Sequence, residues 1–246
     1  MRNRADAGHK PEKQEKPLIS RNPIFVLLTT LFYYLVGVPL LGLGDRLVFG
    51  LQVRGKENIK AVKGKGAVVV CNHVHPFDCT FLGLLIAPRK AVFTSLERLF
   101  PLPVVGPLIR CMGSVPVPTA PSRMRRFLQE MTQAVQQARL LCIYPEGELI
   151  PYYNGLRDFR EGAFTIAAKA DAPIVPVVIS KRPRRGLWKL IKRKPTLTIT
   201  AGEPIYPTQE ENPRRRAHLL HDKTVSVMNA MLQELESPQG QDDACA

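Results

Sequence analysis

Apolar positions in this chain fall into short runs, and the length and period of each run predict its secondary structure. Continuous, β-branched runs bounded by polar residues are typical of strands buried on both faces. Three runs have this character: residues 67–71, 140–144 and 174–179. Residues 91–94 and 196–200 predict two further strands. Val115-Pro116-Val117 predicts a short edge strand, because proline is excluded from central ones.

Helical periodicity occupies the segments between these strands. Residues 122–138 predict an amphipathic helix with Ser122 as its cap, and residues 96–112 predict a helix broken by prolines. Pro76 suits the first turn of a helix that continues through residues 80–86. Two more helices are expected at residues 161–170 and 214–235. Strands that alternate with helices predict an α/β fold, with a mixed, largely parallel sheet flanked by helices.

The first long apolar run, residues 24–43, carries no charge and is just long enough to cross a bilayer. Basic residues precede it, so a simple span with its N-terminus in the cytosol would place the rest of the chain outside the cell. Glycines and a proline crowd its second half. We therefore expect a broken helix or hairpin embedded in one leaflet. A buried core helix is the alternative, and a signal peptide is disfavoured because no cleavage site follows.

These patterns divide the chain into four parts: a basic segment (1–22), a membrane anchor (23–52), a globular domain (53–236) and a polar tail (237–246). A formal charge of +14 and a pI near 9.9 predict attraction to phosphate on lipid, substrate or nucleic acid. The basic run 181–194, which includes Trp188, suits an anionic membrane surface, with a solvated loop as the alternative. No nucleic-acid partner is expected, because no binding module accompanies the charge.

The five cysteines form no C-x-x-C pair and predict buried, reduced thiols.

Unusual polar residues follow two of the predicted strands. Asn72-His73-x-x-x-x-Asp78 leaves the strand at 67–71, so the aspartate can orient the imidazole as a general base for a substrate hydroxyl. Glu146-Gly147 follows the strand at 140–144 and can accept hydrogen bonds from a polyol or an amide, although an ordinary turn would look the same.

The histidines also allow a metal site. His73, His75 and Asp78 could ligate zinc, but no further ligand cluster appears in the sequence, so no metal is expected. His218-x-x-His221 falls on a predicted helix face and is expected to face solvent.

Taken together, Asn72-His73-x4-Asp78, Pro145-Glu146-Gly147 and residues 174–177 (IVPV) resemble the glycerophospholipid acyltransferase family, the PlsC-type 1-acylglycerol-3-phosphate acyltransferases and their relatives. Residues 97–113 look like the family's second block, and residues 158–164 look like the segment between its third and fourth blocks. The resemblance covers residues 53–205, most of the globular domain.

The resemblance implies an O-acyltransferase of phospholipid biosynthesis at the cytoplasmic face of the cell membrane. His73 would deprotonate a lysolipid hydroxyl, which attacks the thioester of acyl-CoA or acyl-carrier protein, and Asp78 would orient His73. The substrate-binding residues would be Asn72, Arg110, Glu146 and Gly147. Backbone N–H groups at residues 72–74 or at the following helix start would hold the oxyanion. No cofactor is implied. The alternatives are a catalytically idle lipid- or partner-binding relative and a metal-dependent hydrolase.

The chain departs from the family at two places where arginines are thought to grip the acceptor's phosphate. Thr119 and Leu149 stand there instead, and Glu148 adds negative charge. These departures predict that a phosphomonoester is held poorly and that a neutral, zwitterionic or amine-bearing lysolipid is used better. The expectation reverses if one of four nearby arginines takes over the phosphate: Arg110, Arg123, Arg157 or Arg160.

Overall fold

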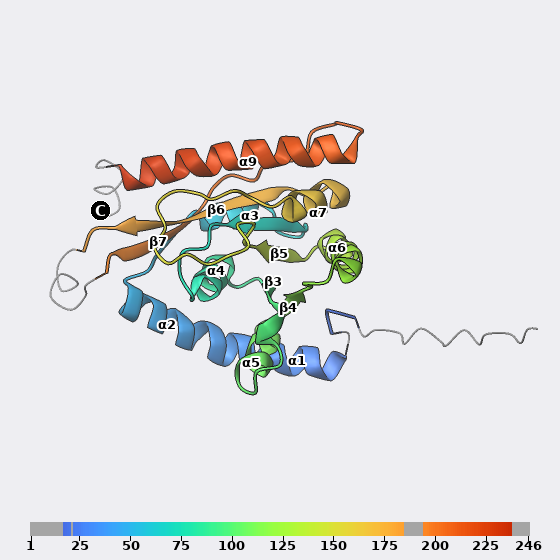
Figure 1. The fold of residues 1–246 in the computed structure, drawn as a ribbon. Helices are drawn as coiled ribbons and strands as arrows, with labels where there is room; N and C mark the ends of the chain where they lie inside the picture. The colour runs from blue at the N-terminus through green and yellow to red at the C-terminus, as the bar shows by residue number, and fades with distance from the viewer. Residues whose placement is uncertain (1–16, 21, 185–193, 238–246) are drawn as a thin grey trace, which may run out of the picture.

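Seven strands form a single sheet at the centre of the computed structural model, which describes residues 17–20, 22–184 and 194–237 (Figure 1). The strands are β1 (Gln52–Arg54), β2 (Ala67–Cys71), β3 (Ala91–Leu96), β4 (Ser114–Val117), β5 (Leu140–Ile143), β6 (Ile174–Arg182) and β7 (Thr196–Ala201). Their order across the sheet is β1-β7-β6-β2-β5-β3-β4. Only β6 and β7 pair antiparallel, so the predicted mixed, largely parallel sheet is confirmed.

Burial follows the sequence pattern. All five residues of β2 are fully buried, because β2 lies between β5 and β6 and is covered on both faces. Strand β4, which contains Pro116, lies at the edge as predicted, where a missing N–H breaks no interior ladder. Strand β1 and the short helix α3 (Lys56–Ala61) were not predicted, because the residues around them favour turns.

Helices cover both faces of the sheet. On one face lie α6 (Pro121–Gln136), α7 (Gly162–Ala170) and α9 (Pro213–Glu236). On the other lie α3 and α4 (Asp78–Ile86), with the 3₁₀ turn Glu97–Leu99 and α5 (Val105–Cys111) beyond the β3–β4 edge. The proline-broken segment 96–112 is thus confirmed.

Two predicted helix starts are wrong. Helix α4 begins at Asp78, and Pro76 lies in the turn before it; the side chain of Asp78 accepts the N–H groups of Val74 and His75 and so holds that turn in place. Helix α6 has Ala120 at its N-cap, without a side-chain cap, and Ser122 lies inside its first turn. Pro121 there fits the first helical position, where a missing N–H costs nothing.

The N-terminal apolar segment is one continuous helix, so the predicted broken helix or hairpin is wrong. Helix α1 (Pro23–Phe32) passes through a π-helical turn (Tyr33–Gly37) into α2 (Val38–Phe49), 27 residues in all. Pro39 lacks the N–H that would bond to residue 35, and the π turn just before it absorbs the defect without breaking the helix. By length and composition this helix is able to cross a membrane.

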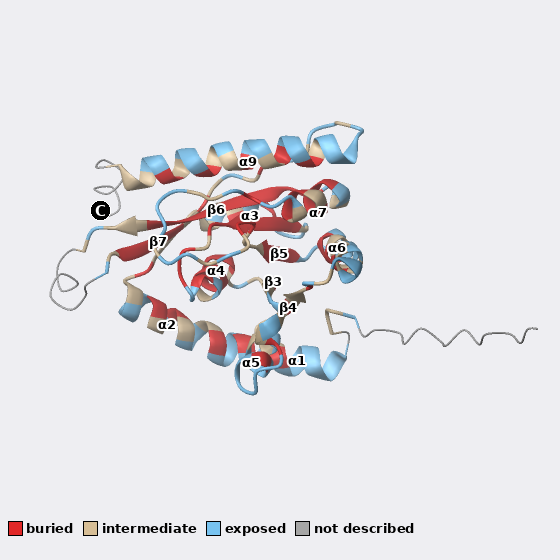
Figure 2. Ribbon diagram, viewed as in Figure 1, coloured by how far each residue is buried: buried red, intermediate tan, exposed pale blue. Residues whose placement is uncertain are grey.

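The burial of this helix is the reverse of that of an ordinary surface helix. The face toward the domain carries small or polar residues: Thr29, Tyr33, Gly37, Gly42 and Asp45. The opposite face is apolar and exposed, with Leu35 72% and Leu40 66% accessible (Figure 2). Both halves lie along the domain, α2 against α4 and α1 against α5 (Figure 1).

Several expectations concern residues partly or wholly outside the described ranges. Residues 185–193, with Trp188, lie outside them, as do residues 1–16 and Cys245.

The four described cysteines are free thiols; Cys71 and Cys142 are buried as predicted, Cys111 is partly buried and Cys79 is exposed.

Candidate active site

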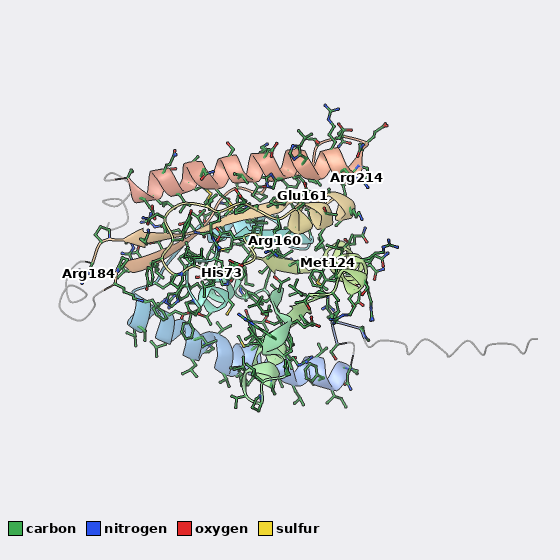
Figure 3. The ribbon with its side chains drawn as sticks, in the orientation of Figure 1. His73, Met124, Arg160, Glu161, Arg184 and Arg214 are labelled. Atoms are coloured by element: carbon green, nitrogen blue, oxygen red, sulfur yellow. The ribbon has the colours of Figure 1, made fainter. Side chains whose placement is uncertain are left out.

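The predicted pair forms in the turn between β2 and α4. Nδ1 of His73 lies 2.9 Å from Oδ2 of Asp78, and the same oxygen accepts the N–H groups of Val74 (2.8 Å) and His75 (2.9 Å). Asp78 is fully buried, whereas the side chain of His73 is 24% exposed (Figure 3). Burial raises the pKa of the Asp78 carboxyl, and the hydrogen bond from His73 and the two amides oppose that rise. The pair therefore has a fixed carboxylate and an accessible imidazole.

Asn72 anchors this turn to the neighbouring strand. Its side-chain Nδ2 donates to the carbonyl of Ile179 (3.1 Å), and its Oδ1 accepts the N–H of Ile179 (2.8 Å). The amide is buried, and its Oδ1 also accepts from Sγ of Cys71 (3.8 Å). Asn72 was predicted to bind substrate, but this geometry supports a positioning role for it, one residue before His73.

Tyr144 stacks on the imidazole of His73, with ring centres 4.3 Å apart and planes 19° from parallel. It follows β5, which runs parallel to β2 with Ile143 level with Val70, so both strands deliver their next residues to the same edge of the sheet. Its hydroxyl is buried and has no hydrogen-bond partner among the described residues. Tyr144 was not among the predicted site residues; its place at the end of the strand predicted at 140–144, directly before Pro145-Glu146-Gly147, was the available signal.

Glu146 lies behind His73 and forms a buried ion pair. Its Oε2 accepts the N–H of His73 (3.3 Å) and pairs with Arg157, whose Nη2 is 2.5 Å and whose Nε is 3.0 Å away. The side chains are 1% and 14% exposed. Oε1 of Glu146 is buried without a partner in the described part of the chain. Arg157 also donates to the carbonyl of Glu148, so it braces the whole turn.

Gly147 completes this group. It has φ +74°, a conformation that strains any residue with a Cβ. A Cβ there would also lie 2.6 Å from the guanidinium carbon of Arg160, which rests directly on the glycine. The structure thus brings together five of the six predicted site residues: Asn72, His73, Asp78, Glu146 and Gly147.

Arg110 is the exception. It is exposed on α5, beside α1, and its guanidinium lies over the ring of Phe100, 4.9 Å from the ring centre. Thr119, at one of the two departures from the family pattern, donates to Glu97, which is paired with Arg123. These residues belong to the β3–β4 edge, and they do not join the His73 group.

His75 does not share a metal site with His73. Its Nδ1 accepts the N–H of Phe77 (3.2 Å), and its ring packs against Phe49 and Phe81. Elsewhere in the described part of the chain, His218, His221 and Asp222 on α9 have potential ligand atoms within 4.8 Å of one another. His218 faces solvent as predicted, whereas His221 is half-buried against Phe164.

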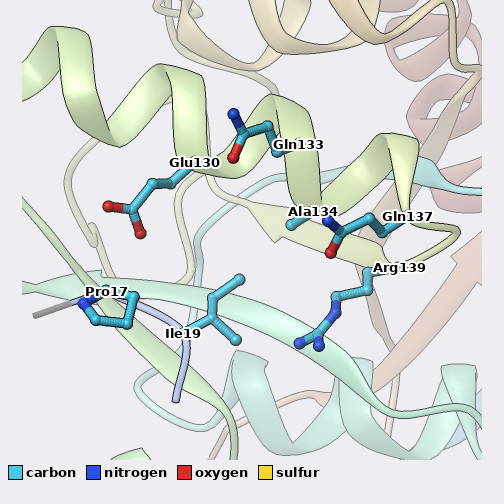
Figure 4. Close-up of a pocket in the computed structure, with 7 residues that line it drawn as sticks. All are labelled: Pro17, Ile19, Glu130, Gln133, Ala134, Gln137 and Arg139. Carbon is cyan, nitrogen blue, oxygen red and sulfur yellow. The ribbon is translucent and has the colours of Figure 1, made fainter. Parts of the chain in front are cut away.

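A cavity beside α6 lies at the end of the sheet where β5 begins (Figure 4). It is lined by Pro17, Ile19, Glu130, Gln133, Ala134, Gln137 and Arg139. The last two precede β5, whereas Tyr144 and Glu146 follow it, so this cavity is separated from His73 by the length of the strand. The N–H of Leu18 bonds to Glu130 (2.8 Å) and holds the N-terminal segment there.

Comparison with known proteins identifies the class of the His73 site. A family model described as acyltransferase matches residues 50–180, a range that contains every residue of the His73 group. The chain belongs to the acyltransferase family. It is an O-acyltransferase of lipid metabolism, as the resemblance in its motifs implied.

Named relatives agree with this assignment. The chain is 26% identical to a 1-acyl-sn-glycerol-3-phosphate acyltransferase of Bacillus subtilis, over 76% of this chain and 89% of that protein. It is 32% identical to the human 1-acyl-sn-glycerol-3-phosphate acyltransferase beta, over 54% of this chain and 48% of the relative. The chain thus spans about half of the human enzyme but nearly all of the bacterial one.

A solved structure shares the fold of this acyltransferase. The crystal structure of the 1-acyl-sn-glycerophosphate (LPA) acyltransferase PlsC from Thermotoga maritima aligns with a TM-score of 0.57 at 21% identity. The alignment covers 87% of this chain and 98% of that one. At this identity the likeness concerns the architecture, a mostly parallel sheet flanked by helices, and it agrees with the predicted fold class.

Proposed function

We propose that this acyltransferase moves a fatty acyl group from a thioester to the free hydroxyl of 1-acylglycerol-3-phosphate or a closely related lysolipid in phospholipid biosynthesis. The observation that carries the proposal is the His73–Asp78 pair. Because Nδ1 of His73 is bonded to the buried carboxylate, Nε2 is the ring nitrogen that remains for a substrate. The names of the relatives support the choice of acceptor.

The geometry suits general-base catalysis. Asp78 holds the tautomer in which Nδ1 carries the proton, so the lone pair of Nε2 accepts the proton of the acceptor hydroxyl as its oxygen attacks the thioester carbonyl. The carboxylate then stabilises the imidazolium. When the tetrahedral intermediate collapses, the carbon–sulfur bond breaks and the imidazolium returns the proton to the departing thiolate. The products are the ester and the free thiol.

Several of the N–H groups expected to hold the oxyanion already have hydrogen-bond partners. The N–H of His73 bonds to Glu146, and those of Val74 and His75 bond to Asp78, so the donors expected at residues 73–74 are already occupied. These bonds instead preorganise the loop that carries the base. At the start of α4, the other region proposed from the sequence, the N–H groups of Phe77, Asp78 and Thr80 are bonded as well, so this pattern favours neither region for the oxyanion.

The assay that tests the proposal separates donor, acceptor and metal dependence. Purified protein in mixed micelles receives labelled acyl-CoA or acyl-carrier protein with lysolipids that differ only in headgroup. We expect a labelled diacyl product that requires both thioester and lysolipid and that forms in excess chelator. Thioester hydrolysis alone, or activity that a metal restores after chelation, would support the hydrolase alternative. Binding of lysolipid without turnover would support the catalytically idle one.

We propose further that the helix Pro23–Phe49 lies in the plane of the membrane, at its cytoplasmic face. Apart from Arg46 in the last turn, its outward face is apolar, and such a patch on a soluble domain would be unfavourable in water. Its inward face packs on α4 and α5, so a transmembrane orientation would place those helices inside the bilayer as well. The exposed Val104, 75% accessible before α5, extends the same apolar surface.

This arrangement predicts how the protein distributes between membrane and cytosol. The wild-type chain should sediment with membranes, and a tag at its C-terminus should be digested by protease added from the cytosolic side. The double change Leu35→Glu and Leu43→Glu should move most of it to the supernatant, because each charge must enter the interface. Leu219→Glu on α9, where the leucine is 40% exposed, is the matched control and should stay membrane-bound. Termini found on opposite sides of the membrane would instead require a full span.

A further inference from the structure

One of the four arginines near the departures from the family pattern is held in a way that suits anion binding. The guanidinium of Arg160 lies flat on the backbone of Gly147, where a Cβ would come within 2.6 Å of its central carbon and 2.7 Å of Nε. Arg160 comes from the loop before α7, and its own N–H donates to the carbonyl of Pro145 (2.9 Å). Both ends of the residue are thus fixed against the turn Pro145–Gly147, while the side chain stays exposed (Figure 3).

Two of the other three arginines are paired with carboxylates, and the third, Arg110, lies on α5 away from the His73 group. Arg157 is bound to the buried carboxylate of Glu146, Arg123 is paired with Glu97, and Arg110 lies over Phe100. Arg160, in contrast, forms no salt bridge with any carboxylate in the described ranges 17–20, 22–184 and 194–237. Its five N–H donors are therefore available to a ligand.

The position of Arg160 relative to the base is also suitable. Gly147 follows Glu146, whose carboxylate is 3.3 Å from the backbone N–H of His73. In a glycerol monophosphate ester, two carbons and the ester oxygen separate the reacting hydroxyl from phosphorus. A hydroxyl at His73 therefore places the phosphate a short way off, and the turn that borders His73 through Tyr144 and Glu146 carries Arg160 on its Gly147. Arg160 also precedes by two residues the start of α7, a nine-residue helix whose N-terminal end adds positive potential.

We propose that Arg160 binds the phosphate of the acceptor and takes the place of the arginines that the family pattern expects near residues 119 and 149. The inference rests on the proposed function, and it specifies the acceptor as an anionic phosphomonoester. A guanidinium forms two parallel hydrogen bonds with phosphate, which offset the cost of desolvating the dianion. Gly147 is required in two ways, for its positive φ and for the space that the guanidinium occupies. The expected preference for uncharged lysolipids is therefore reversed.

The test compares Arg160→Gln with Arg125→Gln, which removes the same charge from an exposed position on α6. Both variants are assayed with 1-acylglycerol-3-phosphate and with monoacylglycerol at equal surface density. For Arg160→Gln we expect the ratio of kcat/KM between the two acceptors to fall about 10- to 100-fold, the usual loss for a hydrogen bond to a charged group. Arg125→Gln should keep the wild-type ratio. Arg160→Lys should be intermediate, because it keeps the charge and loses the paired bonds.

A second readout does not depend on turnover of the acceptor. Glycerol 3-phosphate should inhibit wild-type transfer competitively against 1-acylglycerol-3-phosphate, and its inhibition constant should rise about tenfold or more in Arg160→Gln. An unchanged acceptor ratio and an unchanged inhibition constant in a folded Arg160→Gln protein would overturn the assignment of Arg160. Failure of the wild-type protein to acylate any lysolipid would overturn the proposed function instead, so the two failures are distinguishable.

Discussion

His73→Ala will abolish acyl transfer in a protein that remains folded, and Asp78→Asn will lower kcat by orders of magnitude. The first change removes the base; its side chain is partly exposed, so no core is lost. In the second, the carboxamide oxygen can accept the three bonds that Oδ2 of Asp78 accepts, but the side chain is neutral and no longer stabilises the imidazolium. The corresponding change in the triad of serine proteases costs about 10⁴-fold, which sets the expected scale. The measurement is single-turnover transfer from labelled acyl-CoA.

Thermal unfolding provides the control, and its sign follows from the pKa of Asp78. Burial raises that pKa in the folded protein, so the folded state binds the proton more tightly than the unfolded state does. The free energy of unfolding then falls as pH rises from the pKa of Asp78 in the unfolded state to its raised pKa in the folded state. At neutral pH the buried charge of Asp78 therefore lowers the stability of the folded protein. Asp78→Asn should therefore melt no lower than wild type at pH 7 while it loses activity. Near-normal turnover in a folded His73→Ala protein would rule out the general-base mechanism.

Arg157→Met will be the most destabilising single change in the loop around the active site. It leaves the carboxylate of Glu146 buried and unpaired, with Oε1 already lacking a partner. Breaking a buried ion pair on one side costs about 3–5 kcal/mol, because the remaining charge is no longer compensated. Transfer activity should fall as well, since the same carboxylate holds the N–H of His73. The measurement is denaturant unfolding in detergent, with circular dichroism as the probe.

A double-mutant cycle separates this pair from general disruption. Glu146→Gln combined with Arg157→Met should recover part of the stability that Arg157→Met loses, because it removes the unpaired charge. Arg215→Met is the surface control: it breaks the exposed pair with Glu210 and should cost less than about 1 kcal/mol. If Arg157→Met were no worse than Arg215→Met, the ion pair with Glu146 would not be the element that holds this loop.

The sequence by itself determined the features that depend on neighbours along the chain. The β-branched runs of β2, β5 and β6 are strands because their residues are apolar on both faces, and Pro116 marks an edge because it lacks a donor. His73 and Asp78 are five residues apart, so one turn suffices to bring them together. The family followed from the order of such local motifs. Pattern analysis did less well where the signal was weak, at β1, at α3 and at the π turn that keeps the anchor helix continuous.

Only the tertiary structure decided which distant side chains meet at His73. Tyr144 stacks on the imidazole and Asn72 bonds to Ile179 because β2 lies between β5 and β6, an order that no residue pattern specifies. The sequence offered Arg110, Arg123, Arg157 and Arg160 as equivalent cations. The fold buries Arg157 with Glu146 and sends Arg110 to α5, while Arg160 rests on Gly147. The physical reason is that a charge acts through its distance and burial, and long-range strand pairing fixes both.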